Sequence, residues 1–209
     1  FGKLGGLSRH TEVAYTVFVY AGMLPWAFFA DAVSQSSQSL VASSSLLTKV
    51  YFPRLVIPGA SVAGLLVDFA ISLVVMAFLL IVYQVVPGPN LVLLPLLILA
   101  TVLAAMGTGT LLSALTVAYR DFRYVVPFLL QIWMFASPVA YPLKLVPERW
   151  QVAYALNPMA GIIDGYRASL LGEPLHGMCL GVSVASAAVV FLIGVTYFRR
   201  FERRFADIV

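Results

Sequence analysis

The side chains that carry chemistry in enzymes are sparse in this sequence. It has two histidines, His10 and His176, and one cysteine, Cys179. A single cysteine excludes a disulfide within the chain and a cysteine-based zinc cluster. The sequence also lacks a G-x-x-x-x-G-K-[ST] phosphate loop, H-E-x-x-H and G-x-S-x-G. Both histidines fall in predicted loops, where we expect them to be solvated. We therefore predict a protein that is not an enzyme and holds no metal or cofactor of its own.

Asp68 is the one acid well inside a long apolar segment. It follows Pro58 by about ten residues, which is on the order of 15 Å along a helix. An acid within the membrane is a candidate functional residue. No Lys or Arg lies inside a predicted span to pair with it. We therefore expect a buried structural acid, bonded to hydroxyls such as those of Ser61 or Ser72, rather than a proton carrier.

A short connector, YFPRLVIP with Lys49 just ahead of it, combines three unusual properties. Its prolines restrict the backbone, its paired aromatic rings could anchor it on a partner, and its cations add charged contacts. An ordinary basic loop would explain the cations but not the paired aromatics. Such a stiff element could transmit force between subunits. The residues concerned are Lys49, Tyr51, Phe52, Pro53, Arg54 and Pro58.

The composition identifies the kind of element that must position these residues. Of 209 residues, 61% are hydrophobic and 11% charged, with a mean hydropathy of +0.96. Soluble domains are roughly 45–50% apolar and about 25% charged. The chain is therefore predicted to be an all-α polytopic membrane protein, one transmembrane domain over residues 1–209. In such a chain, a formal charge of +4 indicates basic cytoplasmic loops or contact with anionic lipids rather than nucleic-acid binding.

Five apolar runs are predicted to be spans, since a bilayer-crossing helix needs about 20 residues. The fourth run is short and broken by Pro127 and Pro138. Between the first two lies a Ser/Gln-rich stretch, residues 34–45, which is either a linker or a polar continuation of the helix. We favour the helix because leucines keep an apolar face. The spans are Val13–Ala30, Gly59–Gln84, Leu91–Ala118, Tyr124–Ala140 and Met178–Phe198.

Residues 143–173 are too polar to cross the membrane but carry helix signals. Pro147 suits a helix start, and Asn157 followed by Pro158 is typical of an N-cap with proline at the first helical position. Apolar residues then recur at helical spacing up to Leu170. The pattern predicts two short amphipathic helices, lying at the membrane surface or re-entrant.

The distribution of cations predicts the topology. Cytoplasmic loops are enriched in Lys and Arg, and the tail FRRFERRF is strongly basic. A cytoplasmic C-terminus places the connectors over residues 46–58 and 118–124 on the same side by alternation. Five spans then leave Phe1 outside, so we expect a sixth span upstream of it.

Aromatic side chains are frequent along the spans, and they include Trp26, Phe28, Trp133 and Tyr141. Interfacial belts and lipid contact are one explanation. The alternative is that a subset faces a lumen, where flat rings with a polar edge pack against sugars.

Three segments resemble, in order and spacing, the membrane subunit of ABC-2 type polysaccharide exporters, the permeases of O-antigen, capsule and teichoic-acid ABC transporters. They are LPWAFFADAVSQSSQSLVASSSLLTKVYFPRLVIP, VAYRDFRYVVPFLLQIWMFASPVAYPL and VPERWQVAYALNPMAGIIDGYR. The resemblance implies a six-span permease of the bacterial inner membrane. It further implies a homodimer whose lumen passes a lipid-linked polysaccharide, and a separate ATPase subunit that binds ATP and Mg.

The resemblance also implies roles for parts of this chain. Residues 46–58 would be a cytoplasmic coupling element against the ATPase, and residues 118–124 a second cytoplasmic connector. Residues 143–173 would be an external helical pair near the exit gate. The coupling residues of the second connector would be Arg120, Asp121 and Arg123. The gate residues would be Pro147, Trp150, Tyr154, Asn157 and Pro158.

Other functions stay open on the sequence alone. An ABC-2 permease for a drug or lipid would share the connectors. A gradient-driven secondary carrier should show paired intramembrane charges or internal repeats, and neither is visible. A membrane enzyme such as a glycosyltransferase would need clustered acids or histidines, which are also missing.

Overall fold

The computed structural model describes residues 11–43, 53–119 and 121–202, and every regular element in these ranges is helical. This confirms the all-α prediction. The long helices are α1 (Thr11–Ala42), α3 (Val56–Val82), α4 (Leu94–Ala118) and α8 (Gly177–Glu202). The shorter elements are η1 (Pro89–Leu93), α5 (Phe122–Phe135), η2 (Leu143–Leu145), α6 (Glu148–Tyr154) and α7 (Pro158–Leu171).

Within the described part of the chain, four helical segments are long and apolar enough to cross a membrane: Tyr15–Ala42, Val56–Val82, Pro89–Ala118 and Gly177–Glu202. The predicted fourth span is shorter than expected. Helix α5 has 14 residues, about 21 Å at 1.5 Å per residue, against a hydrocarbon core of about 30 Å. It ends at Phe135 because Pro138 disfavours helical backbone at the residue before it.

Helix α1 continues into the Ser/Gln-rich stretch, as favoured, and ends at Ala42 after 32 residues. Residues 44 and 45 of the stretch lie outside the described residues. Three serines of this stretch, Ser36, Ser37 and Ser39, are buried in the bundle, whereas Gln35 and Gln38 are exposed. Ser36 and Ser37 are fully buried, and Gly109 of α4 leaves no room for a Cβ beside Ser36. The close approach of α1 to α4 therefore covers the hydroxyls that would be costly in lipid.

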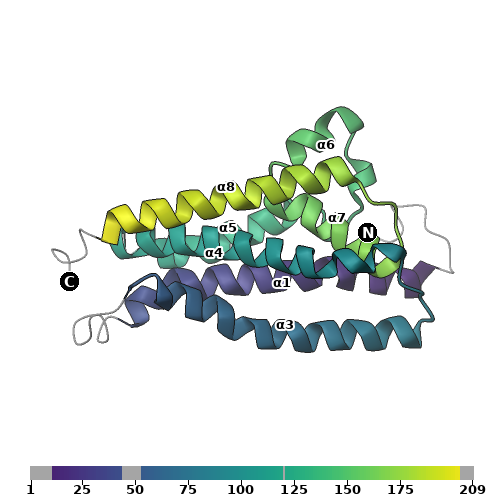
Figure 1. Cartoon of the computed structure of the whole chain (residues 1–209), viewed down its shortest axis with the longest axis horizontal. Coiled ribbons are helices and arrows are strands. Elements are labelled where there is room, and N and C mark those ends of the chain that lie inside the picture. Colours follow the sequence, from purple (N-terminus) through teal and green to yellow (C-terminus); the bar gives the residue numbers. More distant parts are fainter. Residues whose placement is uncertain (1–10, 44–52, 120, 203–209) are drawn as a thin grey trace.

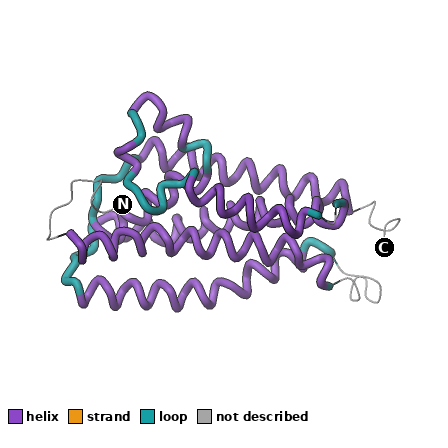
Figure 2. The backbone as a smooth tube through the Cα atoms, turned by 180° about the vertical axis from the view of Figure 1, so that it is seen from behind, coloured by secondary structure: helices purple, strands orange, loops and turns teal. Residues whose placement is uncertain are grey.

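The long helices run side by side along the long axis, with α3 on one flank and α8 on the other (Figure 1). Seen from behind, α6 and the loops around it project from one end (Figure 2). Helix α7 lies within the bundle, packed on α8, α1 and α4. All of its residues from Pro158 to Leu170 are buried. Helix α7 therefore has no exposed polar face, because Asp164, Tyr166 and Arg167 find partners inside the bundle. Its placement at the membrane surface or as a re-entrant element stays a prediction.

The chain brings three separate segments to one end of the bundle (Figure 1). They are the end of α1 with the start of α3, the junction of α4 and α5, and the end of α8. We call this the connector end. The opposite end, with α6 and α7, is the far end. A small apolar cluster of Leu40, Ala114 and Phe198 joins α1, α4 and α8 beneath the connector end.

Candidate functional site

The connector end holds the start of α3 against the end of α8. The Arg54 backbone N–H donates to Glu202 Oε1 at 3.3 Å, and Arg54 Nη1 donates to the Glu202 carbonyl at 3.3 Å. Leu55 and Ile57 extend the apolar cluster underneath. The start of α3 is therefore fixed to the bundle through a charged contact and an apolar one.

The other predicted coupling residues are only partly described. Lys49, Tyr51, Phe52 and Arg120 lie outside the described residues. Pro53, Asp121 and Arg123 are exposed, and Arg123 lies 6.0 Å from the centroid of the Tyr124 ring. The described parts of both connectors thus come together at one end, and their coupling role stays a prediction.

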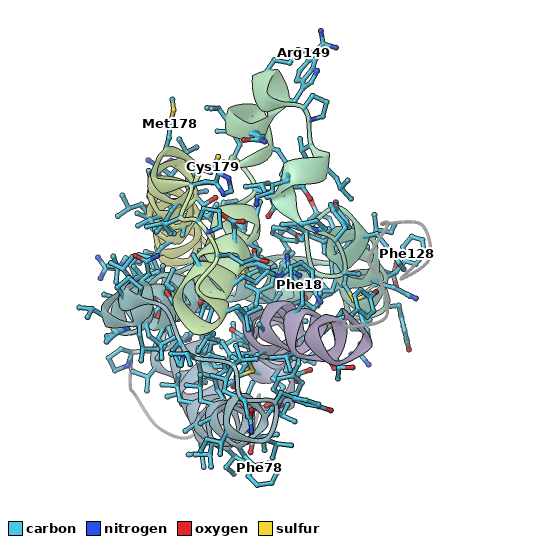
Figure 3. All side chains as sticks on the ribbon, turned by 90° about the vertical axis from the view of Figure 1, so that its right-hand side faces the viewer. Phe18, Phe78, Phe128, Arg149, Met178 and Cys179 are labelled. Carbon is cyan, nitrogen blue, oxygen red and sulfur yellow. The ribbon has the colours of Figure 1, made fainter. Side chains whose placement is uncertain are left out.

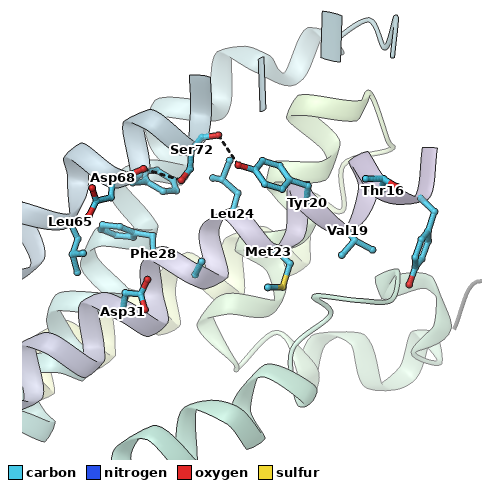
Figure 4. A pocket seen from close by; sticks show the side chains of 13 residues that line it. Thr16, Val19, Tyr20, Met23, Leu24, Phe28, Asp31, Leu65, Asp68 and Ser72 are labelled. Carbon is cyan, nitrogen blue, oxygen red and sulfur yellow. Dashed lines mark hydrogen bonds between the residues drawn. The ribbon is translucent and has the colours of Figure 1, made fainter. Parts of the chain in front are cut away.

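A groove of about 590 Å³ opens between α1 and α3 (Figure 4). The Tyr20 hydroxyl donates to the Ser72 carbonyl at 3.3 Å across it. Asp31 from α1 and Asp68 from α3 face the same part of the groove, and both are exposed in the single chain. The lining residues are Tyr15, Thr16, Val19, Tyr20, Met23, Leu24, Ala27, Phe28, Asp31, Leu65, Asp68, Phe69 and Ser72.

The expectation that Asp68 is a buried acid bonded to serines is wrong. The Ser72 hydroxyl donates to the Asp68 backbone carbonyl at 2.9 Å, and the Ser61 hydroxyl to the Ile57 carbonyl at 3.2 Å. Serines within helices commonly bond the carbonyl four residues earlier, so these hydroxyls are not directed to the carboxylate. Asp31 was missed because the sequence placed it at the end of a span, whereas α1 continues beyond it.

The four aromatic residues assigned to a lumen have different surroundings. Phe28 lines the groove and packs on Phe69, with ring centroids 4.8 Å apart. Trp26 is 3% exposed and lies in the apolar core. Trp133 meets Phe29 edge to face at 5.2 Å. The groove thus contains one of the four, and the lumen assignment stays a prediction.

Asn157 joins the end of α5 to the start of α7. Its Oδ1 accepts from the Met159 N–H at 3.1 Å, which confirms the predicted N-cap, and also from Trp133 Nε1 at 3.0 Å. Its Nδ2 donates to Ser137 Oγ at 2.8 Å and to the Ala136 carbonyl at 3.2 Å. One side chain therefore satisfies polar groups left by the break between α5 and α7.

Tyr141 and Tyr154 form a second link at the far end. Tyr141 donates its hydroxyl to the Phe135 carbonyl at 3.1 Å, and the two phenol oxygens lie 2.7 Å apart. Burial, and then the hydrogen bond to Tyr141, raise the pKa of Tyr154 above its ordinary value of 10.0. In contrast, Pro147 and Trp150 of the predicted gate set are exposed, Trp150 by 58%.

His176 lies in the loop before α8, as expected, but its side chain is only 29% exposed and has a partner. Its Nδ1 lies 2.9 Å from Oδ2 of Asp164, whose side chain is 8% exposed. The pair links α7 to the residue before α8. Periodicity could not reveal it, because the polar face of α7 was taken to be exposed. Among the described residues, no three His, Cys, Asp or Glu side chains gather as a candidate metal site.

Comparison with known proteins gives a consistent result. The profile of the ABC-2 type transporter family matches residues 1–171. The O-antigen export system permease protein RfbA of Myxococcus xanthus is 32% identical over 180 residues, 85% of this chain and 69% of that protein. RfbA of Klebsiella pneumoniae is 26% identical over 93% of this chain and 76% of that protein.

A more distant relative is the polysialic acid transport protein KpsM of Escherichia coli. It is 20% identical over 96% of this chain and 80% of that protein. The family match covers most of the chain and agrees with the multi-pass helical architecture. This chain therefore belongs to the ABC-2 type transporter family, as a membrane permease.

Proposed function

We propose that this chain is the permease subunit of an ATP-driven transporter that exports a lipid-linked polysaccharide across the bacterial inner membrane. The names of its relatives, O-antigen permeases and a polysialic acid transport protein, support a polysaccharide substrate. ATP and Mg would bind to a separate ATPase subunit. The permease would act as a homodimer, with a lumen between the two copies.

The observation that supports a lumen at this face is the pair of carboxylates in the groove. Asp31 and Asp68 belong to helices that are long and apolar enough to cross a membrane, and both residues are exposed in the single chain. A carboxylate facing lipid at the centre of a span costs roughly 3 kcal/mol or more. This face of α1 and α3 is therefore better suited to a wet conduit than to lipid.

The chemistry of the groove suits a sugar chain. Its carboxylate and hydroxyl oxygens, on Asp31, Asp68 and Tyr20, can accept hydrogen bonds from sugar hydroxyls. The Phe28 ring offers a flat apolar face that packs against sugars. A purely apolar cargo would leave the two carboxylates without partners. A polyhydroxylated substrate therefore fits the groove better than a hydrophobic drug.

The connector end would receive the force from the ATPase in the cytoplasm. The exposed described residues of both connectors, Pro53, Asp121 and Arg123, lie at this end, together with Arg199 and Arg200 in the last turn of α8. The hydrogen bond between Arg54 and Glu202 would transmit a force on the first connector to α8. Replacing both rings, Tyr51→Ala with Phe52→Ala, should then weaken ATPase binding and export. Unchanged binding and export would refute the coupling element.

The proposed function is tested by ATP hydrolysis in vesicles that contain the permease and its ATPase subunit. We expect lipid-linked polysaccharide to raise the rate of hydrolysis above its basal level. The same lipid carrier without sugar, and an uncharged hydrophobic drug, should leave the rate unchanged. Stimulation by the drug or the bare lipid, without an effect of the polysaccharide, would favour the ABC-2 drug or lipid permease instead.

A further inference from the structure

We propose that Arg167 is a positioning residue that ties the far ends of α1 and α5 to α7, so that these three segments move together during transport. This inference rests on the proposed function for its transport readout, while the tie itself is a property of the fold.

The guanidinium of Arg167 is almost completely buried, with 1% of the residue exposed. It donates to three carbonyls of the chain that leaves α5. Nη1 bonds Pro138 at 2.7 Å and Tyr141 at 3.0 Å, and Nη2 bonds Val139 at 2.5 Å. These carbonyls follow the end of α5, so no helical N–H satisfies them. Arg167 thus supplies donors that the broken helix lacks.

The same guanidinium also holds α1. Nε donates to the Phe18 carbonyl at 3.4 Å, and the Phe18 ring lies 3.8 Å from the guanidinium carbon. Phe18 points into the bundle in the end view (Figure 3). A buried cation on an aromatic face is stabilised by the ring quadrupole. One side chain of α7 therefore contacts both α1 and the exit of α5.

Gly22 makes room for this arrangement. A Cβ at this position of α1 would lie 2.5 Å from Nη2 of Arg167 and 2.8 Å from the Val139 carbonyl oxygen. Both neighbours are fixed by their mutual hydrogen bond. The glycine thus permits α1 to approach the guanidinium and the α5 exit at the same time.

The position of Arg167 connects it to the connector end. Helix α1 runs from this contact to Ala42 at the first connector, and α5 runs from Phe122 at the second connector to Phe135. If α1 or α5 slid past α7, the carbonyls or the guanidinium would stay buried without hydrogen-bond partners. Such burial costs free energy. A displacement that starts at either connector therefore moves α1, α5 and α7 together.

The test measures ATP hydrolysis and polysaccharide export by the complete complex in vesicles. Arg167→Met should keep hydrolysis near its normal rate but lower export per ATP by at least about tenfold, the size of a typical coupling energy. Arg149→Met, an exposed cation on α6 that points outward, is the matched control and should change neither rate. Unchanged export in Arg167→Met, or an equal fall in both rates, would overturn the proposal.

Gly22→Ala provides a second test that leaves the charge in place and also covers the case in which Arg167→Met fails to fold. It should reproduce the loss of export per ATP, because its methyl group displaces the guanidinium. Gly181→Ala, at a helical glycine with open space around it, is the control and should behave like the unmodified protein. Normal export in Gly22→Ala would refute the tie.

A readout without substrate separates this inference from the proposed function. Hydrogen exchange of residues 136–142 and 158–171 is followed in the complex with and without ATP. In the unmodified protein, ATP should change the exchange rates of the two segments together. In Gly22→Ala, it should change the rates of the two segments separately. If they still respond together in the variant, Arg167 does not tie them, whatever cargo the transporter carries.

Discussion

At the scale of single residues, the far end depends on side chains that satisfy backbone groups freed by helix breaks. Asn157 caps α7 and accepts the indole N–H of Trp133. Within the hydrocarbon region, water cannot replace such partners, so an irregular backbone is tolerated only where the protein satisfies it. These residues therefore permit a broken helix inside a membrane bundle.

We expect Asn157→Ala to lower the free energy of unfolding by about 2–4 kcal/mol. The loss of an N-cap costs about 1 kcal/mol, and a buried indole N–H without an acceptor costs about 1–3 kcal/mol. Denaturant titration in detergent measures the change. Asn90→Ala, in η1 before α4, is the control and should cost less than about 0.5 kcal/mol. A cost below about 1 kcal/mol for Asn157→Ala would contradict this role.

Tyr154 predicts a pH dependence at the far end. Its pKa in the folded protein lies above the ordinary value of 10.0, so the unfolded chain releases this proton first as the pH rises. The contribution of Tyr154 to stability is therefore complete below pH 10 and is lost at higher pH. Between about pH 9 and about pH 11, Tyr154→Phe should lose less thermal stability than the unmodified protein.

The melting temperature at the two pH values measures this difference. Tyr124→Phe, which alters a tyrosine that is 76% exposed, serves as the control and should lose as much stability as the unmodified protein. An equal loss in Tyr154→Phe and the unmodified protein would show that this phenol is not protected by its partner.

At the scale of elements, the bundle is held by close contacts between long helices. Gly107 of α4 lies against the backbone of Phe191 in α8, with only 2.5 Å between a Cβ built at Gly107 and the Phe191 Cα. On α8, the Gly107 carbonyl occupies the space that a Cβ at Gly194 would need. In membranes, such small residues permit van der Waals packing between helices.

Gly194→Ala is expected to destabilise the protein by about 1–3 kcal/mol, because the added methyl group overpacks the α4–α8 contact. Gly181→Ala on the same helix meets open space and should be neutral or stabilising, since glycine in a helix costs roughly 0.5–1 kcal/mol relative to alanine. Unfolding of the two variants in detergent gives the comparison. Equal stabilities would argue against tight α4–α8 packing.

Several elements could be predicted from local signals and others could not. The helical continuation over the Ser/Gln-rich stretch followed from its leucines, and the N-cap of α7 followed from the Asn157-Pro158 pair. The burial of α7 could not be predicted, because an amphipathic pattern expects Asp164 and Arg167 to be exposed. Their partners, His176 and the carbonyls after α5, come from other parts of the chain. Such long-range pairing leaves no periodic signal.

At the scale of the whole molecule, the account depends on which faces of the bundle meet lipid. Val67 is 66% exposed and does not line the groove, whereas the neighbouring Asp68 does. The two lie at nearly the same depth along α3, since one residue adds about 1.5 Å. Their environments should therefore differ in polarity although their depth is similar.

Cysteine labelling tests this orientation. In a Cys179→Ala background, Asp68→Cys should react with a charged thiol reagent at least about tenfold faster than Val67→Cys, because the thiolate forms in water rather than in lipid. The assay uses the assembled complex in vesicles. Slow reaction at both positions would mean that lipid or another helix covers the groove, and the lumen would then lie elsewhere.

The most direct measurement is the movement of lipid-linked polysaccharide across the membrane of sealed vesicles that contain the permease and its ATPase subunit. We predict transport that requires ATP and both subunits and is unaffected when ion gradients are collapsed. Transport that continues without ATP but stops when the gradients are collapsed would contradict the account, as would the absence of any polysaccharide movement with ATP.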